Sequence, residues 1–201
     1  MDKQFIEELA SAAPTPGGGA ACAYVGVLAT CLTSMVGNLT VGKERYRNVE
    51  EEARQKLVQL ERIRERLANL VRADEEAFAP LAAAYRMPRG TDEERALREA
   101  AVQEALYGAS EVPLEVMETI LEALGVAKFF AYNGNRSALS DIGAAATFAR
   151  AAAHGVRMTV VANISSMKDE QRARIYKQRM DSLIADIDQQ SEFVESYVLD
   201  Y

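Results

Sequence analysis

The stretch Pro14-Thr15-Pro16-Gly17-Gly18-Gly19, with the uncharged run that follows it to Gly42, decides the fold of this 201-residue chain. No Asp, Glu, Lys, Arg or His lies between Leu9 and Gly42, although 26% of all residues are charged. The prolines and glycines predict a stiff, bare loop, and residues 20–41 predict one helix that is apolar on every side. Because such a helix has no polar face, it must be surrounded by lipid or by the rest of the protein.

A membrane-spanning helix is the alternative to a buried one, because about 20 apolar residues cross a bilayer. The run is filled with glycine, serine and threonine, and it lacks an aromatic belt and a flanking cluster of basic residues. The leader, residues 1–8, is acidic, whereas a signal peptide begins with basic residues. We therefore expect residues 20–41 to form a buried central helix, wrapped by amphipathic neighbours, in a protein without a membrane role.

Size and composition favour one helical domain over residues 1–201. The chain is rich in alanine, leucine and glutamate and has no Trp. Its net charge of −7, without a basic stripe, argues against nucleic-acid binding. Cys22 and Cys31 match no metal or redox motif and point to opposite sides of one helix. We expect both to be reduced core thiols in a cytoplasmic protein.

Residues 49–85 carry apolar side chains in steps of three and four, which predicts a long amphipathic helix. Its length would be roughly 50–60 Å, and Pro80 should kink it near its end. A helix of this length is too extended for a compact monomer of this size. We therefore expect a homodimer or a higher homo-oligomer that packs its far end.

Capping and breaking residues predict the remaining helices. Thr91, followed by three acidic residues, should cap a helix that reaches Ser110, and Pro113 should open the next one. Gly155 should stop a helix whose end is satisfied by His154. The expected helices span 2–12, 20–41, 49–85, 91–110, 113–132, a segment from Ser137 or Ser140 to 154, 156–164 and 169–198. Together they predict an all-α fold, a helical bundle around a buried apolar helix.

A phosphate-loop spacing occurs at residues 37–43, but its context is wrong. Glu44 stands where a Ser or Thr should hold magnesium, and the segment follows a helix instead of a strand. The spacing therefore does not predict a nucleotide site.

Asp74 lies on the apolar stripe of the long helix, three residues after Val71 and four before Phe78. A carboxylate there is costly unless it is paired or hydrogen-bonded. It is either half of a structural ion pair, with Lys43 or an Arg as partner, or a desolvated acid or base.

A second polar cluster is expected between two apolar helices. It comprises Asn133, Asn135, Ser137, Ser140 and Asp141. Asp141 in a first helical turn complements the helix dipole, but the cluster holds more polar groups than one cap requires. Asn163, inside an apolar segment, must find hydrogen-bond partners if it is buried.

With these residues assembled, the chain resembles the cyclodeaminase/cyclohydrolase family of folate enzymes. The matching pieces follow in family order over nearly the whole chain: residues 14–19, residues 38–43 with Tyr46, Asp74 ahead of Ala77-Phe78, Glu111-Val112-Pro113, Asn135 leading to Ser140-Asp141-Ile142-Gly143, and Asn163. One departure is Ala20, where a serine often follows the third glycine, and we expect little consequence from it.

The resemblance implies an all-helical dimer that binds a reduced folate, with or without a polyglutamate tail, and needs no metal or other cofactor. As a hypothesis, Asp141 is the charge partner and base for the one-carbon unit, Asp74 holds the pterin or relays protons, and Lys43 donates a proton or binds the glutamate tail. The substrate-binding residues implied are Pro16, Gly17, Gly18, Gly19, Tyr46, Asn135, Ser140 and Asn163.

The family acts on the one-carbon unit joined to N5 and N10 of tetrahydrofolate, by two reactions. A cyclohydrolase opens 5,10-methenyltetrahydrofolate to the 10-formyl form, and a cyclodeaminase closes 5-formiminotetrahydrofolate to the methenyl form with loss of ammonia. We expect the cyclohydrolase, because the chain carries no fused formiminotransferase domain. The alternatives are the cyclodeaminase and, more distantly, a non-catalytic helical interaction protein.

Overall fold

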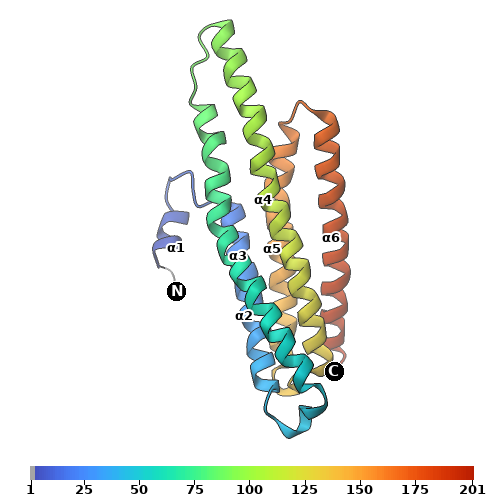
Figure 1. Ribbon diagram of the computed structural model, residues 1–201. Coiled ribbons are helices and arrows are strands. Elements are labelled where there is room, and N and C mark those ends of the chain that lie inside the picture. The colour runs from blue at the N-terminus through green and yellow to red at the C-terminus, as the bar shows by residue number, and fades with distance from the viewer. Residues whose placement is uncertain (1–2) are drawn as a thin grey trace.

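The computed structural model describes residues 3–201. All regular structure in this part of the chain is helical, so the predicted all-α fold is confirmed (Figure 1). The elements are α1 (Lys3–Leu9), α2 (Gly18–Thr40), η1 (Glu44–Val49), α3 (Glu50–Tyr85), α4 (Asp92–Asn133), η2 (Arg136–Ala138), α5 (Leu139–Ser165) and α6 (Glu170–Leu199), where η denotes a 3-10 helix. The predicted start of the first helix at Asp2 lies outside the described residues.

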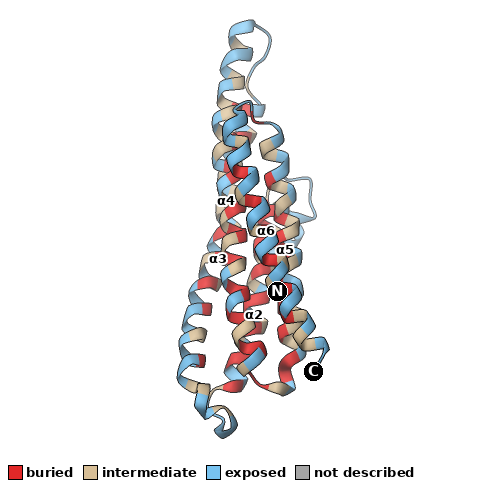
Figure 2. Ribbon diagram, turned by 90° about the vertical axis from the view of Figure 1, so that its right-hand side faces the viewer, coloured by how far each residue is buried: buried red, intermediate tan, exposed pale blue. Residues whose placement is uncertain are grey.

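Helices α2 to α6 run alternately up and down in an elongated antiparallel bundle, and the α3–α4 hairpin projects beyond the other helices (Figure 1). α4 packs against each of α2, α3, α5 and α6 and therefore shares the central position expected for residues 20–41. Figure 2 shows the buried residues along the inward faces of the helices. The largest fully buried side chains of α4 are Leu106, Leu114, Met117, Ile120, Leu124 and Phe130.

The apolar helix α2 is covered by its neighbours on some sides and stays open on one. Small residues permit a close approach, since a Cβ added at Gly37 would lie 2.6 Å from Leu57 and 2.8 Å from Phe130. On the open side, Leu28, Met35 and Leu39 remain 42%, 40% and 39% exposed. Within one chain, α2 is therefore surrounded only in part.

Of the helices in residues 3–201, α2 is the one that is long and apolar enough to cross a membrane, and core helices of soluble proteins have the same length and composition.

The expectation of two core thiols is wrong for one of them. Cys22 is half-buried, whereas Cys31 lies on the open side of α2 and is exposed.

Two predicted helix ends are wrong, and both errors come from a breaking residue inside a packed helix. Residues 92–133 form one helix with Pro113 in its interior, where two helices were expected. α5 continues through Gly155 to Ser165, and the absent side chain there makes room for Cys22 of α2. The predicted helix over 156–164 is confirmed as part of α5. Neither Ser137 nor Ser140 caps α5, because Asn135 caps η2 instead.

Other boundaries are confirmed by their capping contacts. Thr91 accepts a hydrogen bond from Glu94 N at 3.1 Å, and the Glu94 side chain accepts from Thr91 N at 3.1 Å, which is a capping box. Asp169 caps α6 by accepting from Arg172 N at 2.9 Å.

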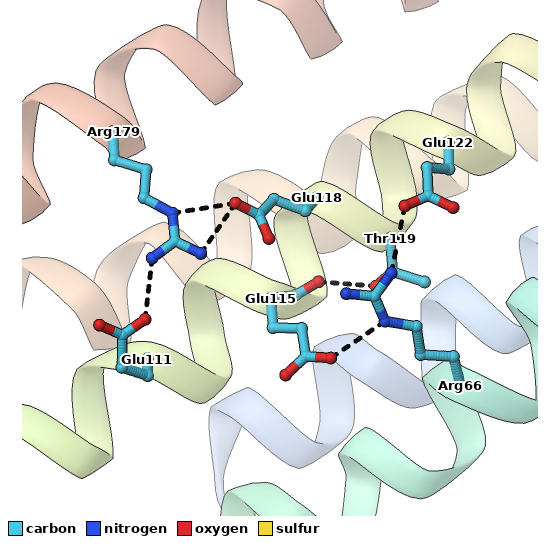
Figure 3. Close-up of polar contacts among 7 residues, drawn as sticks. All are labelled: Arg66, Glu111, Glu115, Glu118, Thr119, Glu122 and Arg179. Atoms are coloured by element: carbon cyan, nitrogen blue, oxygen red, sulfur yellow. Dashed lines mark hydrogen bonds and ion pairs between the residues drawn. The ribbon is translucent and has the colours of Figure 1, made fainter.

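Two arginines hold the outward face of α4 to its neighbours (Figure 3). Arg66 of α3 pairs with Glu115 and Glu122, and Arg179 of α6 pairs with Glu111 and Glu118. Each arginine thus joins two glutamates seven residues apart. Because all these side chains are at least one-third exposed, each pair adds little stability. The spacing of the glutamates matches the observed register of α3 and α6 along α4.

Candidate active site

Asp74 of α3 lies at the first turn of α2. Its Oδ2 accepts a hydrogen bond from Ala20 N at 2.9 Å, so a side chain from a distant helix caps α2. The local N-cap residue, Gly17, makes no side-chain cap. Within residues 3–201 Asp74 has no cationic partner, so the predicted ion pair with Lys43 or an Arg is not formed in the chain.

The glycine loop permits this contact. A Cβ added at Gly19 would lie 2.6 Å from Cγ of Asp74, whereas a Cβ added at Gly17 or Gly18 would meet nothing within 4 Å. The N–H groups of Gly18 and Gly19 precede the first intrahelical bond and have no acceptor in the described chain. The sequence therefore leaves two free amides beside a carboxylate.

These groups line a cavity of about 400 Å³. It is bounded by Pro14, Thr15, Gly17, Gly18, Gly19, Asp74, Phe78, Ala109, Met158, Thr159, Ala162 and Asn163. A larger hollow, of about 670 Å³, lies between α3 and α4, and half of its lining residues are alanines. Its ionisable groups are Glu104 and Tyr107, so it lacks the convergent polar groups of a catalytic site. The smaller cavity is the candidate active site.

Burial raises the pKa of the Asp74 carboxyl, the hydrogen bond from Ala20 opposes this, and the charge of Glu75 adds to it. The net direction is upward. Burial and the charge of Asp74 also raise the pKa of the Cys22 thiol. The raised pKa values favour the thiol form of Cys22 and the protonated form of Asp74.

Asn163 of α5 reaches the cavity from the opposite wall. Its Nδ2 donates to the carbonyl oxygen of Ala109 at 2.8 Å. In an uninterrupted helix, that carbonyl would accept from the N–H of residue 113, which is proline and has none. The side chain from α5 therefore satisfies the group that Pro113 leaves open, and this explains why α4 continues where the sequence predicted a break.

Pro16, also predicted as a site residue, is buried in the loop before α2 and does not line the cavity. The remaining predicted site residues gather at the far end of α2. Asn135 N donates to Thr40 Oγ1 at 2.9 Å, and Asn135 Nδ2 donates to Leu39 O at 3.0 Å. Arg136 N donates to the Tyr46 hydroxyl at 3.1 Å. These contacts fasten the α4–α5 connection to the end of α2. Within the predicted polar cluster, Ser137 N and Ser137 Oγ both donate to Asn135 Oδ1, at 3.1 and 2.8 Å.

Lys43, Ser140 and Asp141 belong to this far end and are not buried. Within residues 3–201 their side chains have no hydrogen-bond or ion-pair partner. α2 has 23 residues, so its two ends are about 33 Å apart. One chain therefore brings together Asp74, residues 17–19 and Asn163, and it does not bring Asp141 or Lys43 to them.

The prediction that His154 satisfies a helix end is wrong, because α5 continues beyond it. Its Nε2 lies 2.8 Å from Oδ1 of Asp188 on α6, and Arg150 Nε donates to the same oxygen at 2.8 Å. Burial would raise the pKa of Asp188, but the bonds from His154 and Arg150 outweigh it and hold that pKa below its usual value. This cluster joins α5 to α6 away from the cavity.

Sequence reasoning missed Thr159, which lines the cavity one helical turn before Asn163. The signal was a spacing of four between two polar residues in an apolar segment, which places them on one helix face. Within residues 3–201 no group of three His, Cys, Asp or Glu side chains is arranged to hold a metal ion.

Comparison with known proteins assigns the chain to a family. The model of the formiminotransferase-cyclodeaminase family matches residues 1–182. The chain belongs to this family. The predicted resemblance is thereby confirmed, and the candidate active site lies inside the matched region.

Three relatives show how far the similarity extends. A methenyltetrahydrofolate cyclohydrolase of Methylorubrum extorquens is 38% identical over 182 residues, which cover 90% of this chain and 88% of the relative. The formimidoyltransferase-cyclodeaminase of Rattus norvegicus is 32% identical over 96% of this chain, but the chain spans only 36% of that protein. The crystal structure of formiminotetrahydrofolate cyclodeaminase from Thermotoga maritima superimposes with a TM-score of 0.89 at 28% identity, covering 100% of this chain and 96% of the other.

Proposed function

We propose that the protein is a methenyltetrahydrofolate cyclohydrolase, which adds water to 5,10-methenyltetrahydrofolate and yields 10-formyltetrahydrofolate. The observation that carries the proposal is the half-buried Asp74 carboxyl beside the free amides of Gly18 and Gly19. The similarity to the Methylorubrum extorquens cyclohydrolase over 88% of that enzyme supports it.

The carboxylate suits the charge of the substrate. The N5–C–N10 bridge is an amidinium cation, which an adjacent carboxylate stabilises more strongly in a partly desolvated cavity than in water. The bound cation also favours the ionised form of Asp74, against the effect of burial. Binding therefore prepares the base that the reaction needs.

The proton transfers can pass through this one group. Ionised Asp74 takes a proton from water as the oxygen bonds to the bridging carbon. The same proton passes to N5 as the bond between carbon and N5 breaks, and the second proton of the water leaves when the formyl C=O forms. This is general base catalysis followed by general acid catalysis.

The free amides of Gly18 and Gly19 provide anchoring. Two N–H groups at the positive end of a 23-residue helix bind an acceptor on the ligand, either a ring carbonyl or a carboxylate. Because this end of α2 also holds Asp74, anchoring and catalysis share one wall of the cavity.

A cyclodeaminase is the second candidate, and the pKa of Asp74 supports it. Burial favours the protonated form of the Asp74 carboxyl, and that form would donate a proton to the departing ammonia when N10 closes the ring on a 5-formimino group. The similarity to the Thermotoga maritima structure supports the same reaction.

We further propose that the active unit is a homodimer in which a second copy covers the open face of α2 and α5. On α5 this face carries Phe148, Ala151 and Met158, with Asp141 at one end and Ala162 at the cavity. Asp141 lies ten residues before Ala151 and Ala162 lies eleven after it. An antiparallel two-fold pairing centred on Ala151 would set Asp141 of one copy beside the cavity of the other.

The same axis suits α2. Leu28 lies near the middle of α2, so antiparallel pairing there sets Lys43 of one copy near the glycine loop of the other. Cys22 faces Gly155, which places Leu28 and Ala151 within about 3 Å of each other along the bundle. The pairing would reunite the two separated groups of predicted site residues in a shared site.

Two assays, run side by side on the purified protein, test the proposed activity. The first follows the disappearance of 5,10-methenyltetrahydrofolate by absorbance, and the second follows its formation from 5-formiminotetrahydrofolate. Enzyme-dependent loss of the methenyl compound alone identifies the cyclohydrolase, and methenyl formation with ammonia release identifies the cyclodeaminase. If a folded protein shows no reaction in either assay and its Tm does not rise with folate, the result favours the alternative of a non-catalytic interaction protein.

A further inference from the structure

Pro113 and Asn163 together determine which hydrogen-bonding atom one wall of the cavity presents to a ligand. Proline at position 113 leaves the carbonyl of Ala109 without its helical donor, and Ala109 is 7% exposed. A carbonyl oxygen accepts hydrogen bonds and never donates them. The group that Asn163 turns toward it must therefore be Nδ2, as the bond of 2.8 Å shows.

This contact determines what Asn163 offers to a ligand. A side-chain amide is planar, with its oxygen and nitrogen on opposite branches. One N–H of Nδ2 bonds to Ala109 O and fixes the plane of the amide, and the second N–H of Nδ2 stays unpaired in the described chain. Oδ1 is therefore held in the other direction, and it has no donor in the described chain. Asn163 thus presents a hydrogen-bond acceptor of fixed orientation at the cavity wall.

We propose that Pro113 is a positioning residue that locks Asn163, and that Asn163 Oδ1 accepts a hydrogen bond from a ring N–H of the bound reduced pteridine. The inference rests on the proposed folate function. A reduced pteridine carries several ring N–H groups, and an acceptor that cannot rotate selects a donor over an acceptor at its position. Asp74 on the opposite wall then faces the one-carbon bridge.

The other helix proline supplies the contrast. Pro80 inside α3 leaves the carbonyl of Glu76 without its helical donor, and Glu76 is exposed. No side chain in the described chain bonds to that carbonyl. A proline in a long helix therefore does not by itself recruit a side chain. Only at Pro113 is the open carbonyl placed where it orients a residue of the cavity.

The test is a double-mutant cycle on wild type, P113A, N163A and P113A/N163A, with P80A as the matched control. Tm tests the first part of the proposal, the link between Pro113 and Asn163. N163A should lower Tm by several degrees, because the Ala109 carbonyl loses its donor. In the P113A background, the new backbone N–H at position 113 restores that bond, so the same substitution should cost much less. Equal losses of Tm in the two backgrounds would overturn the link between the two residues.

Ligand binding reports the second half. N163A should raise KM for 5,10-methenyltetrahydrofolate by about three- to tenfold with a smaller change in kcat, and P113A/N163A should keep the raised KM although its stability is restored. P113A alone should raise KM by less, and P80A should leave it unchanged. A double variant with the KM of wild type would show that Asn163 only supports α4, and would overturn its role as an acceptor.

Binding of 5-formyltetrahydrofolate, measured by calorimetry, separates this inference from the proposed function. A wild type that binds this folate while N163A binds it equally well overturns the inference alone. A folded wild type that binds neither this folate nor the methenyl compound overturns the proposed function, and the ligand half of the inference with it.

Discussion

Asp74 on α3 accepts a hydrogen bond from the backbone N–H of Ala20 on α2, so one carboxylate both caps a helix and faces the cavity. The cap restrains the carboxyl at the positive end of α2, where a negative charge is favoured. Burial acts in the opposite direction and raises its pKa. The cap and the burial thus favour opposite protonation states of Asp74, the group that takes and returns a proton in the proposed reaction.

Replacing Asp74 by Asn should abolish catalysis while the fold is kept. Asn retains an acceptor for Ala20 N–H but cannot take up a proton, so kcat should fall by about 10²- to 10⁴-fold. Steady-state kinetics and a circular dichroism melt check this result. Asp186→Asn, at an exposed carboxylate of α6, is the control and should keep wild-type kinetics. A folded D74N protein with normal kcat would remove Asp74 from the mechanism.

Stability should depend on pH through Asp74, and the sign follows from its raised pKa. In the window above the ordinary Asp pKa and below the folded-state pKa, the folded protein binds more protons than the unfolded chain. The free energy of unfolding therefore falls as pH rises through that window. D74N lacks this proton, so its stability relative to wild type should increase from acid toward neutral pH. Urea unfolding at a series of pH values measures the difference, and a constant difference would contradict the raised pKa.

Gly19→Ala should damage both the cap and the site. The new Cβ would lie 2.6 Å from Cγ of Asp74, so the carboxyl or the first turn of α2 must move. We expect a loss of about 1–3 kcal/mol in the free energy of unfolding, together with a fall in kcat/KM. Gly17→Ala is the matched control, because a Cβ there meets nothing within 4 Å and its φ is −116°. Unfolding curves of the two variants that coincide would refute the close packing at Gly19.

Mixing two inactive variants should restore activity if the dimer shares its sites as proposed. D74N lacks the group that transfers protons, and D141N lacks the carboxylate expected as charge partner of the one-carbon unit, so we expect each to be inactive alone. In a mixed dimer, one site combines the intact Asp74 of one copy with the intact Asp141 of the other. Random exchange of subunits should then recover about a quarter of wild-type activity. The readout is methenyltetrahydrofolate hydrolysis after denaturing and refolding the two variants together.

Two results control this experiment. Each variant refolded alone should stay inactive, and sedimentation should show the same dimer for both. If the mixture stays inactive although mixed dimers are present, Asp141 does not act across the interface. An active D141N protein alone would show that Asp141 is not needed at all.

The all-α bundle, its long helix and the cap at Thr91 were predictable because they depend on local patterns. The steps of three and four over residues 49–85 and the box at Thr91 are complete within a few residues of sequence. The predicted breaks at Pro113 and Gly155 failed because residues far away decide them. Asn163 supplies the donor for one, and Cys22 fills the space beside the other.

The candidate site was predictable only as a set of residue types. Asp74 was recognised from its place on an apolar stripe, and the glycines from their lack of side chains. That these two meet, and that Asp141 stays at the other end of α2, follows from the antiparallel packing of α2 and α3. Spacing along the chain does not contain that information. Thr159 was recognised as a site residue only once the structure placed it in the cavity with Asn163.

The projecting end of the α3–α4 hairpin has a consequence for the order in which the protein loosens. Tyr85 and Leu97 near that end are 48% and 59% exposed, whereas Leu67 and Val116 farther along the same two helices are fully buried. Local unfolding of α3 and α4 should therefore begin at the free end of the hairpin and stop where the two helices pack against the rest of the bundle. Amide hydrogen exchange should be fast around Thr91 and slow progressively toward Leu67 and Val116. The end of the hairpin would then open locally while the packed part of the bundle stays closed, and the cavity lies between these two parts.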